Sequence, residues 1–198
     1  MAKVKEEIEA RAELRLELQG VDHLALVTDD MKKTIDFYTD VLGMTLAHVR
    51  KVPYAPDRGQ PPYENCRHYF FDMGNQSLLA FFEYPPDAPQ GNRDALGGMQ
   101  HVAFHADRAN FRRAQERLRA HGLNVVGPFH LGGRIYSIYF FDPNGVRLEI
   151  TTDLRHEDYD PVTSMYQTEA EAREELETLY DSPGEVERIL TKMPLLGR

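Results

Sequence analysis

Hydrophobic and polar residues alternate in two separate stretches of the chain, and a stretch with helical spacing follows each of them. Residues 21–28 and 100–106 alternate, while residues 31–42 and 108–121 place apolar side chains on one helical stripe. After each helix the pattern predicts three further strands. The expected strands are 45–49, 67–73 and 77–83 in the first half, and 125–129, 135–141 and 146–151 in the second.

The two halves therefore read as an internal repeat of one strand, one helix and three strands. His23 matches His101, Gly43 matches Gly122, and the run Phe-Phe-Asp occurs at 70–72 and again at 140–142. We expect an α+β fold in which two βαβββ modules, residues 20–98 and 99–152, pair into a cup-shaped mixed sheet. Helical patterns outside the repeat predict an N-terminal helix in residues 1–19 and a helical extension over residues 153–198.

Composition and charge narrow the class of protein and its partners. The chain has 198 residues, a net charge of −9 and 41% hydrophobic residues, so we expect no nucleic-acid partner. We also expect no membrane partner, because no apolar run approaches the roughly 18 residues of a spanning helix. The single cysteine, Cys66, fits a reducing cytoplasm. We expect a homodimer or a higher homo-oligomer.

Three potential metal ligands recur at comparable places in the strands. His23, His101 and Glu149 each lie opposite the apolar residues of their own strand, so all three are expected on the concave side of the sheets. Two imidazoles and one carboxylate form a facial set that leaves open positions on a divalent ion and suits Fe(II) working with O₂. Mn, Ni or Zn are alternatives for the same site.

The repeated unit resembles the vicinal oxygen chelate superfamily, which includes glyoxalase I, methylmalonyl-CoA epimerase, fosfomycin-resistance transferases and type I extradiol dioxygenases. The resemblance covers about residues 20–152. It rests on the two histidine strands, Val-Asp-His-Leu-Ala-Leu at 21–26 and Met-Gln-His-Val-Ala-Phe at 99–104, and on Asp-Pro-Asn-Gly at 142–145 followed by Leu-Glu at 148–149. It implies that His23, His101 and Glu149 hold the metal.

The second half is similar in more detail to extradiol dioxygenases. His130, Ile138-Tyr139, the Asp-Pro-Asn-Gly turn and Glu149 follow one another with the gaps of that group's signature, although Pro128 departs from it. The resemblance implies that His130 leans over the metal and that Tyr139 hydrogen-bonds a substrate oxygen.

Two departures concern the first half. Extradiol enzymes carry an acid–base histidine on the last strand of the first module, where this chain has Gln76 or Ser77, and His68 is the substitute candidate. Glyoxalases and epimerases carry a fourth ligand on that strand, where Glu83 is the only candidate.

The resemblance implies a small Fe(II)-dependent extradiol dioxygenase that cleaves an aromatic diol with O₂. Two alternatives remain open. One is a metal-dependent lyase, isomerase or thiol transferase of the same superfamily, and the other is a metal-free ligand-sequestering protein of bleomycin-resistance type.

Overall fold

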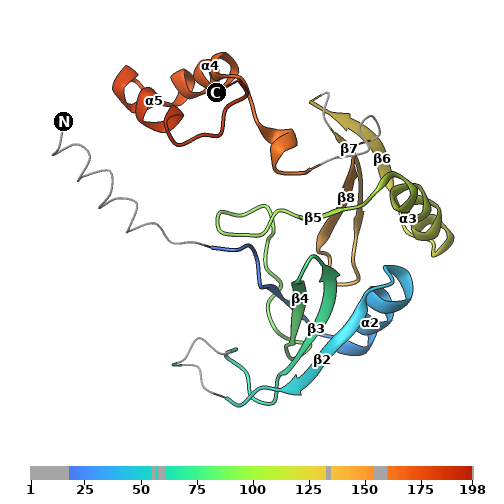
Figure 1. Cartoon of the computed structure of the whole chain (residues 1–198). Coiled ribbons are helices and arrows are strands. Elements are labelled where there is room, and N and C mark those ends of the chain that lie inside the picture. The colour runs from blue at the N-terminus through green and yellow to red at the C-terminus, as the bar shows by residue number, and fades with distance from the viewer. Residues whose placement is uncertain (1–17, 55–56, 58–60, 133–134, 154–159, 198) are drawn as a thin grey trace. The chain divides into compact units, whose positions relative to one another are not determined.

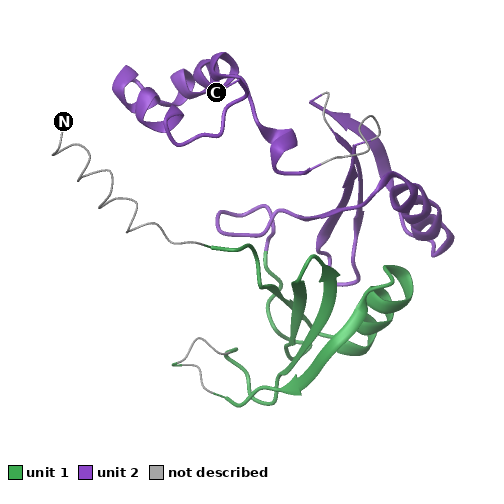
Figure 2. Cartoon of the chain, in the orientation of Figure 1, with its two compact units in different colours: residues 1–91 green, residues 92–198 purple. Residues whose placement is uncertain are grey.

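The structure is a computed structural model that describes residues 18–54, 57, 61–132, 135–153 and 160–197 (Figure 1). The N-terminal helix expected within residues 1–19 falls mostly on residues outside this set. No described helix combines the length and the apolar composition that a membrane span needs. The chain divides into two compact units, Met1–Gly91 and Asn92–Arg198 (Figure 2).

The first unit contains a four-stranded mixed sheet with the strand order β1-β4-β3-β2. Strand β1 runs parallel to β4, and the other neighbours are antiparallel. A helical segment connects β1 to β2. The elements are β1 (His23–Thr28), α2 (Met31–Asp36), a turn of π-helix η1 (Phe37–Val41), β2 (Thr45–Lys51), β3 (Arg67–Gly74) and β4 (Ser77–Glu83).

The second unit repeats this topology in the order β5-β8-β7-β6, again with the first and last strands parallel. The elements are β5 (Val102–His105), α3 (Arg108–Ala120), β6 (Val126–Leu131), β7 (Ile135–Phe141) and β8 (Arg147–Thr152). The predicted α+β class and the βαβββ order are thus confirmed. The pairing of the two sheets into one cup stays a prediction.

Each sheet has one apolar face. In the first unit, Tyr38 of η1 packs against Phe71 of β3 and Phe81 of β4, with ring centroids 5.4 and 5.0 Å apart. In the second unit, α3 contacts β8 and buries Phe111 and Leu118. Because side chains alternate along a strand, the other face of each sheet carries the residues of chemical interest.

The helical segment after β1 differs from the single α-helix expected over residues 31–42. It begins as α2, where the Asp30 carboxylate accepts from the Lys33 N–H at 2.9 Å, and then widens into η1. The Leu42 N–H donates to the Phe37 carbonyl at 3.1 Å, five residues back, which is the hydrogen bond of a π-helix.

The C-terminal extension is helical, as expected. It contains a short 3-10 turn η3 (Thr163–Met165) and two helices, α4 (Glu169–Leu179) and α5 (Pro183–Leu190). Thr168 and Glu171 form a capping box at the start of α4. The two helices bury a small apolar cluster of Ala172, Val186, Leu190 and Leu195.

Candidate metal centre

The second sheet buries a carboxylate on its polar face. Glu149 of β8 lies in register with Ala103 of β5 and Tyr139 of β7, and only 4% of its surface is exposed. The Tyr139 hydroxyl donates to Glu149 Oε1 at 2.9 Å, and His101 Nε2 lies 2.9 Å from Oε2. A carboxylate removed from water needs a hydrogen-bond donor, and the Tyr139 hydroxyl supplies one. The strand pairing therefore brings together two of the three expected metal ligands.

Tyr139 remains a proton donor in this arrangement. Burial raises the pKa of its phenol, and the hydrogen bond to Glu149 and the charge of that carboxylate raise it further. The hydroxyl is therefore neutral around pH 7 and fixes the orientation of the carboxylate that accepts its proton.

Both candidate histidine ligands are oriented by the residue that precedes them. The Gln100 side-chain oxygen hydrogen-bonds Nδ1 of His101, and Asp22 Oδ1 lies 2.6 Å from Nδ1 of His23. A carboxylate or amide oxygen accepts, so the imidazole proton sits on Nδ1 and the Nε2 lone pair is directed away. Histidines that bind metals through Nε2 usually have such an acceptor at Nδ1.

The donor set of the second unit fits a divalent ion. Two ligand atoms that each lie about 2.1 Å from an ion, at right angles to one another, are about 3 Å apart. The separation of His101 Nε2 and Glu149 Oε2, 2.9 Å, matches this value. Within the described part of the chain, no three His, Cys, Asp or Glu side chains gather closely enough to hold an ion. His23 belongs to the first unit.

His68 lies beside His23 on the same face of the first sheet. Its ring centroid is 6.4 Å from that of His23, and its ring stacks on Phe82 at 3.7 Å. Only 4% of His68 is exposed, and no described residue hydrogen-bonds either ring nitrogen. Burial lowers its pKa to about 4, and the positive charge of Arg50 lowers it as well. The imidazole of His68 is therefore a buried, neutral ring packed among aromatic side chains. Proton transfer by His68 stays a prediction.

The first sheet carries no carboxylate at the place that corresponds to Glu149. Glu149 pairs with Ala103, two residues after His101, and Ala25, two residues after His23, pairs with Ala80. The fourth-ligand candidate, Glu83, is held at the end of β4. It forms an ion pair with Arg67 and accepts from the Met31 N–H at 3.0 Å.

The structure does not bring His130 to the Glu149 face. His130 pairs with Tyr136 and stacks on its ring, with centroids 4.5 Å apart, whereas Tyr139 lies on the opposite face of β7. The register of β6 against β7 shifts between Val126 and Phe129. Such a bulge adds one residue and exchanges the two faces of the strand beyond it, so Phe129 takes the face that simple alternation gives to His130.

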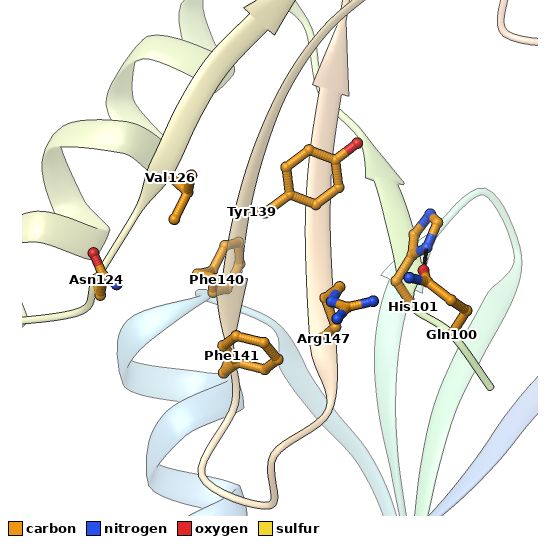
Figure 3. A pocket seen from close by; sticks show the side chains of 8 residues that line it. All are labelled: Gln100, His101, Asn124, Val126, Tyr139, Phe140, Phe141 and Arg147. Carbon is orange, nitrogen blue, oxygen red and sulfur yellow. Dashed lines mark hydrogen bonds between the residues drawn. The ribbon is translucent and has the colours of Figure 1, made fainter. Parts of the chain in front are cut away.

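A pocket of about 480 Å³ opens beside His101 in the second unit (Figure 3). Its wall is mainly apolar and includes Tyr139, Phe140 and Phe141, with Asn124 and Val126 at the start of β6. Arg147 of β8 also lines it, and Figure 3 shows its guanidinium on the side of Gln100 and His101.

Arg147 and Gln100 lie outside the set of site residues expected from the sequence. Arg147 precedes Glu149 by two residues in an alternating strand, so the pattern that places Glu149 on the polar face also places Arg147 there. That signal was present in the sequence. The side-chain contact of Gln100 with His101 needed the structure.

Comparison with known proteins gives consistent matches. Residues 20–150 match the model of the glyoxalase/bleomycin resistance protein/dioxygenase superfamily. A glyoxalase domain-containing protein of Mycosarcoma maydis is 31% identical over 146 residues, covering 72% of this chain and 73% of the relative. Glutathione transferase FosA of Serratia marcescens is 28% identical over 133 residues, covering 67% and 80%. The structure of a glyoxalase/dioxygenase from Nostoc punctiforme has the same fold, with a TM-score of 0.52, 24% identity and coverage of 69% and 92%.

Proposed function

The chain belongs to the glyoxalase/bleomycin resistance protein/dioxygenase superfamily, and we propose that it is a metal-dependent enzyme of extradiol type, which cleaves a catecholic ring with O₂. The observation that carries the metal dependence is the buried Glu149 carboxylate, 2.9 Å from His101 Nε2 and hydrogen-bonded by Tyr139. His23 is the third ligand of the proposal, on the strength of its matching repeat position and its Asp22 partner.

Two observations favour extradiol chemistry over a four-ligand lyase or epimerase. Ala80 stands at the counterpart of Glu149, and Glu83 is already engaged by Arg67. A set of two histidines and one carboxylate leaves three positions of an octahedral ion open. When bound, the ion would supply open positions for both hydroxyls of a catechol and for O₂, and a path for electrons between them.

The side chains of this chain have defined tasks in the proposal. Gln100 and Asp22 hold the two imidazoles with the Nε2 lone pairs free. Tyr139 keeps its phenolic proton and donates a hydrogen bond to Glu149, and the lone pairs of the same oxygen accept a hydrogen bond from a substrate hydroxyl. The exposed ring of Phe141, on the Tyr139 face of β7, supports the substrate ring by stacking.

Oxygen uptake on addition of catechols tests the proposal. The full chain is purified without chelators, loaded anaerobically with Fe(II) and mixed with catechol in an oxygen-electrode cell. We expect uptake of O₂ with formation of a yellow ring-opened product, and loss of both in Glu149→Gln. Glu116→Gln, which removes the same charge on the exposed face of α3, is the matched control. An iron-loaded chain that consumes no O₂ with any catechol would rule out ring cleavage.

A thiol transferase or a lyase is the second candidate, because the chain resembles a glutathione transferase over 67% of its length. That candidate predicts consumption of glutathione in the presence of an electrophilic co-substrate, with Mn, Ni or Zn rather than Fe(II) and without O₂. The same Glu149→Gln and Glu116→Gln pair separates a metal-dependent reaction from a background one.

A further inference from the structure

Arg147 brings a positive charge onto the face of the second sheet that holds the candidate ligands. It lies two residues before Glu149 on β8, so the two side chains point to the same side about 7 Å apart along the strand. Its neighbour across the sheet is Phe141 of β7. The pocket is therefore lined by the His101 imidazole and the Arg147 guanidinium, and Glu149 lies beside it with Oε2 2.9 Å from His101 Nε2.

The guanidinium of Arg147 forms only a long, exposed ion pair within the second unit. Its Nη1 lies 3.7 Å from Asp94 Oδ1, and the Asp94 side chain is 60% exposed. Exposed ion pairs of this kind contribute little to stability, so a ligand can displace the contact at little cost. A second guanidinium, that of Arg93, lies 4.8 Å from the centroid of the Phe141 ring, while its Nη1 donates to the Gly145 carbonyl at 3.0 Å.

This positive end is local, because the chain as a whole carries a net charge of −9. A planar guanidinium binds a carboxylate through two parallel hydrogen bonds. The Phe141 ring, whose centroid is 5.8 Å from the Arg147 guanidinium carbon, offers an aromatic surface next to it. Residues 147 and 149 stand about 7 Å apart along the strand, close to the distance between two opposite substituents of a benzene ring.

We infer that this pocket takes an aromatic ring carrying a carboxylate group, with Arg147 as the residue that selects the carboxylate. The carboxylate group follows from Arg147 alone, whereas the diol at the other end of the ring rests on the proposed function. A ring with hydroxyls and carboxylate at opposite ends, as in 3,4-dihydroxybenzoate, places the carboxylate at Arg147 and the diol toward Glu149 and His101.

Equilibrium binding to the full chain tests the inference without reference to turnover. Titration calorimetry measures the Kd of catechol and of 3,4-dihydroxybenzoate under anaerobic conditions. We expect the wild-type chain to bind the carboxylated ring about tenfold or more tightly than catechol. Arg147→Gln should remove this preference, whereas Arg147→Lys should keep part of it. Arg112→Gln, the same charge change on the exposed face of α3, should keep all of it.

Equal affinity of the wild-type chain for the two rings, or an unchanged preference in Arg147→Gln, would overturn the inference. Circular dichroism identifies a variant that has not folded, in which case the wild-type and Arg147→Lys preferences decide. Displacement of 3,4-dihydroxybenzoate by inorganic phosphate as readily as by benzoate would also overturn it, since the site would then be a general anion site.

The failure of this inference and the failure of the proposed function give different results. If Arg147 governs carboxylate binding but no catechol supports O₂ uptake, the inference stands and ring cleavage does not. If catechol and 3,4-dihydroxybenzoate support equal O₂ uptake and Arg147→Gln changes neither, ring cleavage stands and the inference does not.

Discussion

The carboxylate of Glu149 is buried, and two neighbouring side chains lie against its two oxygens. The Tyr139 hydroxyl and His101 Nε2 both lie 2.9 Å away. The orientation of His101 depends in turn on Gln100, which hydrogen-bonds the other ring nitrogen. A chain of contacts from Gln100 to Tyr139 thus fixes the directions of two atoms proposed to bind a metal ion.

Removal of the Gln100 amide should weaken metal binding without removing a ligand. Gln100→Ala leaves Nδ1 of His101 without its acceptor, so the ring can rotate and take the other tautomer. We expect a loss of about 10–100-fold in affinity for a divalent ion, measured by calorimetry. Gln115→Ala on α3 is the control and should bind like the wild-type chain. Equal affinities for the two variants would show that Gln100 does not orient the ligand.

His68 should make the metal-free chain sensitive to acid. Burial is the main cause that lowers its pKa from 6.5 to about 4. Between these two values the unfolded chain binds a proton that the folded chain does not bind. The free energy of unfolding therefore falls as the pH drops from 6.5 to 4, by about 3 kcal/mol from this residue.

Denaturant unfolding of the chelator-treated chain at several pH values measures this effect. His68→Phe keeps an aromatic ring beside Phe70 and Phe82 and has no proton to bind. Its free energy of unfolding should fall less than that of the wild-type chain over the same interval. Parallel curves for the two proteins would contradict the assignment of the acid sensitivity to His68.

At the scale of elements, the bulge in β6 decides which residues reach the site. Alternation along a regular strand would put His130 on the face of Tyr139, and the register shift between Val126 and Phe129 puts it on the face of Tyr136 instead. Hydrophobic alternation in the sequence was sufficient to place Glu149 with His101. The same alternation could not place His130, because the one extra residue of a β-bulge cannot be recognised from the hydrophobic pattern.

Gly127 makes this bulge possible. Its φ is +105°, and a Cβ there would lie 2.7 Å from the Ser137 carbonyl oxygen. Gly127→Ala should therefore lower the free energy of unfolding by about 3 kcal/mol. Gly145, with a φ of +78° and open space around it, is the control, and Gly145→Ala should cost about 1 kcal/mol. Equal losses in thermal or denaturant unfolding would show that the close approach to Ser137 is unimportant.

At the scale of the whole molecule, the two units share one strand order but differ in chemistry. The first has Phe70 and Ala80 where the second has Tyr139 and Glu149. The repeat and the class of the fold could be predicted from hydrophobic periods and turn residues, whereas the parallel pairing of β1 with β4 and of β5 with β8 came from the structure. Side-chain contacts such as Asp22 with His23, and the pocket at Arg147, depend on register and rotamers that periodicity does not encode.

Metal binding should stabilise the folded chain as a whole. An ion that binds only the folded state at 100 times its Kd adds about 2.7 kcal/mol to the free energy of unfolding. Thermal unfolding in the presence of Mn(II), Ni(II) or Zn(II) should therefore show a higher Tm for the wild-type chain and for Glu116→Gln. Glu149→Gln should show no increase, and a similar increase in all three proteins would mean that the ions bind elsewhere.

The most direct test of the account is the metal content of the chain at equilibrium. Dialysis against a slight excess of a divalent ion, followed by elemental analysis, is applied to the wild-type chain and to His23→Ala, His101→Ala and Glu149→Gln. We expect about one ion per wild-type chain and large losses in all three variants, with His121→Ala, an exposed histidine at the end of α3, unchanged. A wild-type chain that retains no ion, or variants that retain as much as the wild type, would contradict it.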